Sequence, residues 1–208
     1  MATLYLVRHG TTDWVDQHRL HGITDIPLNA AGLAQSEQAA AALKGLKADA
    51  LYSSPLSRCM QTAECLGKAL GIAPVPLDGL REKDFGLLEG RYLRDHTSQD
   101  FNKLVQEFDN LIHRLATLVS GEPRRHFDRR VLAAWQGILR DHPQGCVVIA
   151  GHSGVFNAIL IHLFGRNFPN GKPYYTLQPG SITEIEAAQG GEMHLVRLDD
   201  HRHIRGES

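Results

Sequence analysis

The chain has 208 residues, a length that suits one domain carrying at most a small cap. Hydrophobic residues make up 42% of the sequence and charged residues 22%, which excludes wholesale disorder, and no apolar run approaches the roughly 20 residues that span a bilayer. The formal net charge of −1 removes the electrostatic case for a general binder of nucleic acid or of anionic membranes.

The first segment of the chain predicts a strand followed by a helix. The apolar residues 4–7 predict a buried strand, and no basic segment precedes them as it would in a signal peptide. Residues 31–46 are rich in alanine and predict a helix. Asn29 is the expected N-cap of this helix, and Leu33 is expected on its apolar face.

A second strand and helix follow. Residues 49–53 predict the strand, and Ser54-Pro55 should then begin a helix, because proline suits the first helical position. The core face of that helix is expected to run from Leu56 to Leu70. Residues 71–77 predict a weak strand that two prolines interrupt.

The rest of the chain predicts more helices and strands. Residues 97–119 and 127–139 have the spacing of amphipathic helices. Residues 145–150 form an apolar run that predicts a strand covered on both sides, and residues 155–164 return to helical spacing. Residues 181–198 predict a hairpin around a Gly-Gly turn.

Strands that alternate with helices predict one α/β domain over residues 1–208, a three-layer α/β/α sandwich with a largely parallel central sheet. Residues 91–125 are expected to form a small helical cap, and the polar residues 199–208 a flexible tail. Such sheets bind ligands beyond the carboxyl ends of their strands, so polar segments that follow predicted strands should converge there. The segments are Arg8-His9, residues 53–58 and Gly151-His152.

The three cysteines, Cys59, Cys65 and Cys146, include no Cys-X-X-Cys pair. We therefore expect neither a disulfide framework nor a zinc knuckle. A reducing, cytoplasmic setting is the simplest interpretation.

The segment Arg8-His9-Gly10 combines an imidazole with a guanidinium on a turn after a buried strand. A neutral imidazole can attack phosphorus, and an adjacent arginine can neutralise phosphoryl oxygens. By itself this short motif is more typical of a loop with a surface histidine.

Two further segments could complete an anion site. Arg58 lies in the first turn of a predicted helix, where a guanidinium and a helix N-terminus together attract anions. His152 follows the most apolar strand and could donate a hydrogen bond to a phosphoryl oxygen. The alternatives are a solvated arginine and a histidine that caps a helix.

Three carboxylates near Gly86 could act as the general acid that protonates a leaving alkoxide. They are Glu82, Asp84 and Glu89, and their chemistry alone does not separate them. The alternative is a charged surface loop.

Four ordered segments together resemble the histidine phosphatase superfamily, also called the phosphoglycerate mutase-like family. They are LVRHGTT, YSSPLSRCMQTA, LREKDFGLLEG and VVIAGHSG, within residues 3–165. The resemblance implies that His9 is the phosphorylated nucleophile and Glu82 the proton donor, with Asp84 and Glu89 in supporting roles. Arg8, Arg58 and His152 would complete the phosphate pocket, and neither a metal nor a cofactor is implied. The residues we expect to contact substrate are Arg8, Thr12, His21, Gly22, Arg58, His152 and Ser153.

The sequence departs from the family pattern at the rim of this expected pocket. Val15 stands where many members carry an asparagine that contacts the phosphoryl group, and Thr12, Gln17 or His21 could compensate. Thr11 replaces the glutamate of mutase-type members, and Leu88 stands where tryptophan is common.

Other polar residues favour simpler interpretations. His18 and His21 have a spacing that suits a metal on a helix, but Gly22 and Pro27 favour a loop and no carboxylate cluster completes a site. The basic run from Arg124 to Arg130 is typical of a solvated helix face, and the alternative is that one of its arginines recognises a second anionic group of the substrate.

The sequence therefore predicts a metal-independent phosphomonoesterase that acts on a small phosphorylated metabolite through a phosphohistidine. The alternatives are a phosphoglycerate mutase-type phosphotransferase and a non-catalytic module that binds a phosphorylated ligand. No nucleic acid or membrane is expected as a partner. A homodimer is left open, and the physiological substrate is not readable from the sequence.

Overall fold

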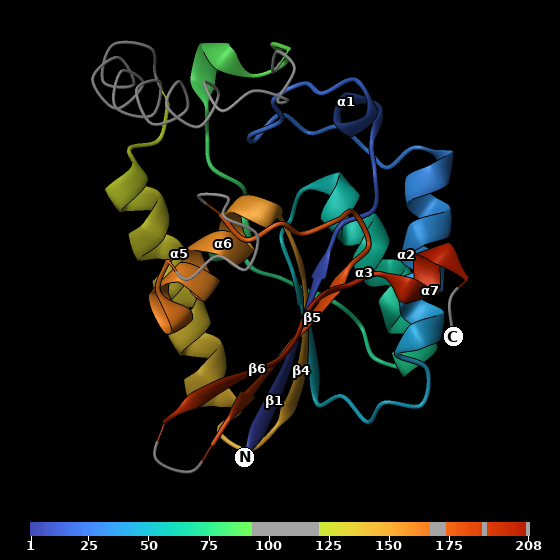
Figure 1. The fold of residues 1–208 in the computed structure, drawn as a ribbon, viewed down its shortest axis with the longest axis vertical. Coiled ribbons are helices and arrows are strands. Elements are labelled where there is room, and N and C mark those ends of the chain that lie inside the picture. The colour runs from blue at the N-terminus through green and yellow to red at the C-terminus, as the bar shows by residue number, and fades with distance from the viewer. Residues whose placement is uncertain (93–120, 167–173, 189–190, 207–208) are drawn as a thin grey trace.

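The computed structural model describes residues 1–92, 121–166, 174–188 and 191–206. Its centre is a sheet with the strand order β3-β2-β4-β1-β5-β6 (Figure 1). The first four of these run parallel to one another, and β5 runs antiparallel to both of its neighbours, β1 and β6. The strands are β1 (Ala2–Arg8), β2 (Ala50–Ser53), β3 (Val75–Pro76), β4 (Cys146–Gly151), β5 (Ile182–Ala187) and β6 (Met193–Asp200). The expected largely parallel sheet is confirmed.

Helices cover both faces of the sheet and make the expected three layers. In Figure 1, α2 and α3 lie on one face, and α5 and α6 lie on the other. The α-helices are α1 (Asp13–Asp16), α2 (Ala30–Ala42), α3 (Ser57–Leu70), α5 (Arg124–Asp141), α6 (Ser153–Phe164) and α7 (Arg202–Arg205). Two short 3₁₀ helices, η1 (Asp78–Leu80) and η2 (Gly86–Leu88), follow β3.

Alternate residues of β1 divide the core into two apolar clusters. Leu4 and Leu6 pack with the side chains of α5 and α6, among them Trp135. Tyr5 and Val7 point to the opposite face and pack with α2 and α3. This alternation is the period of two that a strand imposes on its side chains. The sheet is thereby fixed between its two helical layers.

Two details of the first helices differ from the sequence predictions. Asn29 caps α2 by accepting a hydrogen bond from the Gly32 amide, as predicted, but Leu33 is 45% exposed. The buried face of α2 instead consists of small residues, because its backbone lies directly against the loop after β1. The helix α3 begins at Ser57 rather than at Pro55, since the Ser54 hydroxyl bonds His152 and does not cap the helix.

The C-terminal segment contains a hairpin and a short helix. The hairpin of β5 and β6 is confirmed, and the described residues of the expected tail form the end of β6 and α7. α7 packs against α2 (Figure 1). His203 Nε2 lies 3.0 Å from the Gly180 carbonyl oxygen. Ion pairs of Asp200 with Arg197 and Arg202 satisfy the polar side chains of this segment. The polar composition therefore marks a docked surface segment.

The helix predicted over residues 97–119 and most of the predicted cap over 91–125 lie outside the described residues. Within the described residues, none of the helices has the length and apolar composition needed to cross a membrane.

We expect Gly10→Ala to destabilise the fold and Gly137→Ala to stabilise it. A Cβ atom on Gly10 would lie 2.1 Å from the carbonyl oxygen of Gly32, so β1 and α2 would have to separate, at a cost of about 2 kcal/mol or more. Gly137 lies inside α5, where its Cβ would come no closer than 3.8 Å to Arg140 and alanine should add about 1 kcal/mol. Urea unfolding of both variants tests this, and equal effects would contradict it.

Candidate active site

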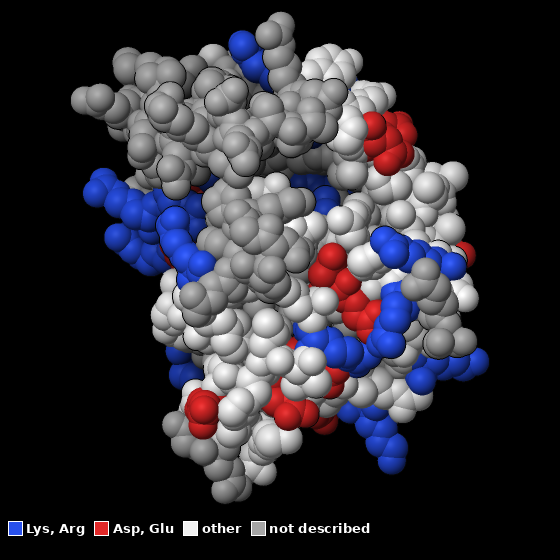
Figure 2. Space-filling model, viewed as in Figure 1, with Lys and Arg blue, Asp and Glu red and all other residues white. Residues whose placement is uncertain are grey.

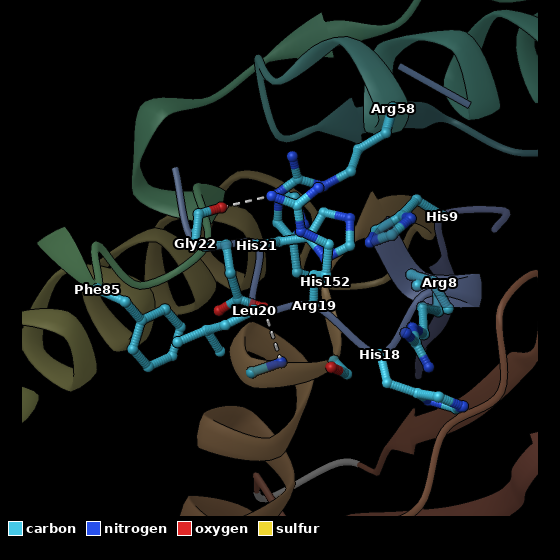
Figure 3. A pocket seen from close by; sticks show the side chains of 14 residues that line it. Arg8, His9, His18, Arg19, Leu20, His21, Gly22, Arg58, Phe85 and His152 are labelled. Atoms are coloured by element: carbon cyan, nitrogen blue, oxygen red, sulfur yellow. Dashed lines mark hydrogen bonds between the residues drawn. The ribbon is translucent and has the colours of Figure 1, made fainter. Parts of the chain in front are cut away.

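A cavity of about 290 Å³ opens at the carboxyl ends of the parallel strands. The five residues expected to carry catalysis all line it (Figure 3): Arg8, His9, Arg58, Glu82 and His152. The segments that follow β1, β2 and β4 therefore meet at one cavity, as the sequence predicts. Three expected substrate contacts, His21, Gly22 and Ser153, line the same cavity.

The imidazole of His9 is buried and held in one orientation. It directly follows β1, and its amide donates to the Gly151 carbonyl at 2.9 Å. Its Nδ1 lies 2.7 Å from the Gly10 carbonyl oxygen, which can only accept a hydrogen bond. The proton therefore sits on Nδ1, and Nε2 keeps a lone pair. Burial, followed by the charges of Arg58 and Arg8, holds the pKa of His9 well below its usual value, so the ring is neutral at pH 7.

Arg8 and Arg58 bring two buried positive charges to His9. Arg58 donates to the carbonyl oxygens of Gly22 at 2.8 Å and Thr24 at 2.9 Å, and Arg8 donates to that of Leu177. Neither arginine forms an ion pair within the described part of the chain, and the buried Nε of each has no hydrogen-bond partner there. Burial lowers the pKa of Arg8 to about 10 and that of Arg58 in the same direction. Such a pair of cations favours a bound anion.

His152 faces His9 across the cavity. Their ring centroids are 5.3 Å apart, and His152 Nε2 lies 2.8 Å from the Ser54 hydroxyl oxygen. The residue occupies the N-cap position of α6, but its side chain makes no capping hydrogen bond. Burial, with Arg58 next, holds the pKa of His152 well below its usual value. The alternative of a capping histidine is therefore wrong for this side chain.

The three carboxylates that the sequence left in competition have separate places. Only Glu82 lines the cavity, where its oxygens accept from the amides of Lys83 at 2.9 Å and Gly154 at 3.1 Å. Glu89 instead accepts from three backbone amides, those of residues 23, 24 and 85. Asp84 accepts from the amide of Gly86 at 2.6 Å. Glu89 and Asp84 therefore build the loops around the site.

Arg130 fixes the backbone that carries Glu82. Its guanidinium donates to the carbonyl oxygens of Gly79, Arg81 and Glu82 at 2.6 to 3.1 Å, and also to both carboxylate oxygens of Glu122. These contacts use all five of its N–H donors. A basic group lies over the first half of α5 (Figure 2), whose sequence contains Arg130. The internal role of Arg130 was not predicted, because the three carbonyl oxygens that it binds belong to residues that lie 48 to 51 positions away along the chain.

The family assignment follows from comparison with known proteins. A model of the histidine phosphatase superfamily (branch 1) matches residues 4–201. The chain belongs to this superfamily. It is 31% identical over 165 residues to a Bacillus subtilis protein named uncharacterized phosphatase PhoE, which covers 79% of each chain. It is 35% identical over 161 residues to the probable phosphoglycerate mutase GpmB of Escherichia coli, which covers 77% of this chain and 74% of that one.

A solved structure of Bacillus stearothermophilus YhfR superposes with a TM-score of 0.78 and 27% identity. The superposition covers 98% of this chain and 100% of that one. The fold of this chain is therefore that of its superfamily. The names of its relatives include both a phosphatase and a mutase.

At the altered rim of the cavity, an imidazole lines the same space as Val15. His21 and Val15 both line the cavity, and the ring centroids of His21 and His9 are 6.4 Å apart. Thr12 is buried, caps α1 and lies 2.6 Å from His21 Nε2 through its hydroxyl. Gln17 is exposed and does not line the cavity. Of the three residues that could compensate for Val15, only His21 borders the pocket.

A metal site at His18 and His21 would need further ligands, and the described residues supply none. Within the described ranges, no three His, Cys, Asp or Glu side chains are grouped so that they could hold a metal ion. His21 Nε2 is engaged with Thr12 instead.

We expect the unfolding free energy to fall as the pH drops from 6.5 toward 5. Burial and the charges of Arg58 and Arg8 lower the pKa of His21 to about 4, and the pKa values of His9 and His152 shift in the same direction. In the unfolded chain these histidines take up protons near pH 6.5, so stability present above that pH is lost below it. The slope of the unfolding free energy against pH should approach the value for an uptake of about three protons on unfolding, and of about two in His21→Gln. Urea unfolding at several pH values measures it, and an unchanged slope in the variant would contradict the assignment.

Proposed function

We propose that the protein hydrolyses phosphomonoesters of small metabolites through a phosphohistidine on His9. The observation that supports this most is the neutral His9 imidazole, whose Nδ1 is held by the Gly10 carbonyl. It shares its cavity with two buried guanidinium groups that have no carboxylate partner in the described residues. A neutral nucleophile flanked by fixed positive charge suits attack on a phosphate dianion.

The proposed reaction has two steps. In the first, His9 Nε2 attacks phosphorus, the P–O ester bond breaks, and protonated Glu82 gives its proton to the leaving oxygen. Arg8 and Arg58 neutralise the phosphoryl oxygens, and His152 hydrogen-bonds one of them. In the second step, water attacks the phosphohistidine, Glu82 takes a proton from that water, and the P–N bond breaks to release phosphate and neutral His9.

The proposed reaction needs neither a cofactor nor a metal, because Arg8 and Arg58 supply the positive charge and His152 supplies a hydrogen bond. Ser153 and Gly22 are proposed substrate contacts, together with Thr12 acting through His21. The cytoplasmic setting expected from the cysteines stays a prediction, as does the open question of a homodimer.

A mutase is the second candidate, because one relative is named a probable phosphoglycerate mutase. A mutase must keep its phosphohistidine away from water. Here α7, at the C-terminal end, packs against α2 rather than over the cavity. Thr11, which stands where mutase-type members carry a glutamate, does not line the cavity, and its hydroxyl donates to Asp16 at 2.8 Å. We therefore favour hydrolysis. Isomerisation of 3-phosphoglycerate much faster than phosphate release, with 2,3-bisphosphoglycerate present, would overturn this choice.

Rapid quench with ³²P-labelled phosphomonoester in excess EDTA should trap an acid-labile, base-stable protein phosphate. The label should be absent from His9→Ala, because that variant lacks the nucleophilic Nε2. Label that persists in His9→Ala, or that appears on serine or cysteine, would contradict the proposal. Turnover without His9 would have the same meaning, and no turnover of any phosphomonoester would favour the non-catalytic binding module.

Glu82→Gln should slow an alkyl phosphate by about 100-fold and an aryl phosphate far less, because a phenolate leaves without help from an acid. The matched control is Asp84→Asn, since Asp84 bonds the Gly86 amide and does not line the cavity. Values of kcat on the two substrates give the comparison. An equal loss on both would assign Glu82 to binding.

A further inference from the structure

The turn after α1 holds a histidine in a backbone conformation that favours glycine. His18 has φ of 53°, its amide donates to the Val15 carbonyl at 3.0 Å, and the Arg19 amide donates to the Trp14 carbonyl at 2.8 Å. This is the Schellman pattern that ends helices, and its left-handed position is usually glycine. A side chain kept at such a strained position points to a function. Here the exposed imidazole borders the cavity.

The next residue, Arg19, is a positive charge held in one place. Its guanidinium carbon lies 4.5 Å from the Trp14 ring centroid and 5.5 Å from that of Tyr92. Its Nε donates to the Gly90 carbonyl at 2.6 Å, which leaves most of the donors on its Nη atoms for a ligand. No carboxylate pairs with Arg19 in the part of the chain that the structure describes.

Both side chains belong to the same cavity as His9 but lie outside its phosphate-binding centre. Short steps connect Arg19 to this centre through Trp14: the ring centroids of Trp14 and His21 are 5.6 Å apart, and those of His21 and His9 are 6.4 Å apart. Arg19 is also among the charges that lower the pKa of His21. In Figure 3, His18 lies apart from Arg58, on the opposite side of the drawn cluster.

The described lining of the cavity around these two residues carries no negative side chain. Glu82 is the carboxylate among the lining residues, and it is held by the amides of Lys83 and Gly154. Val15 and Leu20, which also line the cavity, add apolar surface. A leaving group in this space would therefore meet positive charge and apolar side chains.

We infer that His18 and Arg19 form a subsite for a second anionic group, a carboxylate or a second phosphate, on the leaving group of the substrate. This inference rests on the proposed phosphatase activity, and it selects substrates with two negative groups a few bonds apart. Arg19 supplies the fixed charge, and His18 donates a hydrogen bond at the mouth of the cavity.

Three phosphomonoesters that share a three-carbon chain test the subsite. They are 3-hydroxypropyl phosphate, which is neutral beyond its scissile phosphate, 2-carboxyethyl phosphate and propane-1,3-diyl bisphosphate. The wild type should show kcat/KM about tenfold higher on the two doubly anionic probes, the size expected for a charge-assisted hydrogen bond. The better of these two probes identifies the second group as carboxylate or phosphate.

Arg19→Gln should abolish this preference and leave the neutral probe within about twofold of wild type. Arg19→Lys should restore part of it, because the charge remains. His18→Gly should raise Tm by relieving the left-handed strain and lower kcat/KM on the anionic probes alone. The control is Arg140→Gln, which removes an exposed arginine at the far end of α5 and should keep the preference.

Equal kcat/KM of the wild type on all three probes would overturn the inference, as would an equal loss on all three in Arg19→Gln. If no probe is hydrolysed, the proposed phosphatase activity fails, and calorimetry with His9→Ala decides the subsite separately. The subsite is supported if His9→Ala binds the two anionic probes more tightly than 3-hydroxypropyl phosphate and if this difference is lost when Arg19→Gln is added to His9→Ala. Equal binding of the three probes overturns it.

Discussion

Two buried guanidinium groups without a carboxylate partner in the described residues are the constraint on which the site depends. Arg8 and Arg58 are held by the carbonyl oxygens of residues 22, 24 and 177, which fix their positions without cancelling their charge. Burying such charge costs free energy unless an anion joins it. Burial and, after it, these same charges lower the pKa values of His9, His21 and His152 and keep the rings neutral. The charges that attract a phosphate thus also contribute to the loss of stability expected at acid pH.

A second network supports the carboxylate that completes the site. Glu82 is held between the amides of Lys83 and Gly154, and Arg130 binds the carbonyl oxygen of Glu82 itself. Arg130 also binds Glu122, which lies near the C-terminal end of the expected cap segment. The position of the proposed proton donor is therefore set by α5 and α6 as well as by its own loop. Glu89, which binds three amides, keeps the neighbouring loops in place.

Several features were readable from the sequence because they depend on neighbouring residues. The apolar run that forms β4 is buried on both faces, and Asn29 caps α2, as their local patterns predict. Leu33 was placed wrongly because close contact of two backbones at Gly10 and Gly32 selects small residues for the buried face of α2. The predicted capping role of Ser54 was also wrong, since its hydroxyl bonds His152 at the end of the neighbouring strand.

The sequence by itself determined the alternation of strands and helices, the ordered motifs of the superfamily and the segments that end at the carboxyl edge of the sheet. These follow from periodicity and from residues a few positions apart. Only the tertiary structure decided which of three nearby carboxylates enters the cavity, what Arg130 binds, and that Arg19 stands in the pocket without a carboxylate partner in the described residues. The reason is physical: the deciding contacts join residues 48 to 98 positions apart, and the spacing of residues along a chain carries no information about such distances.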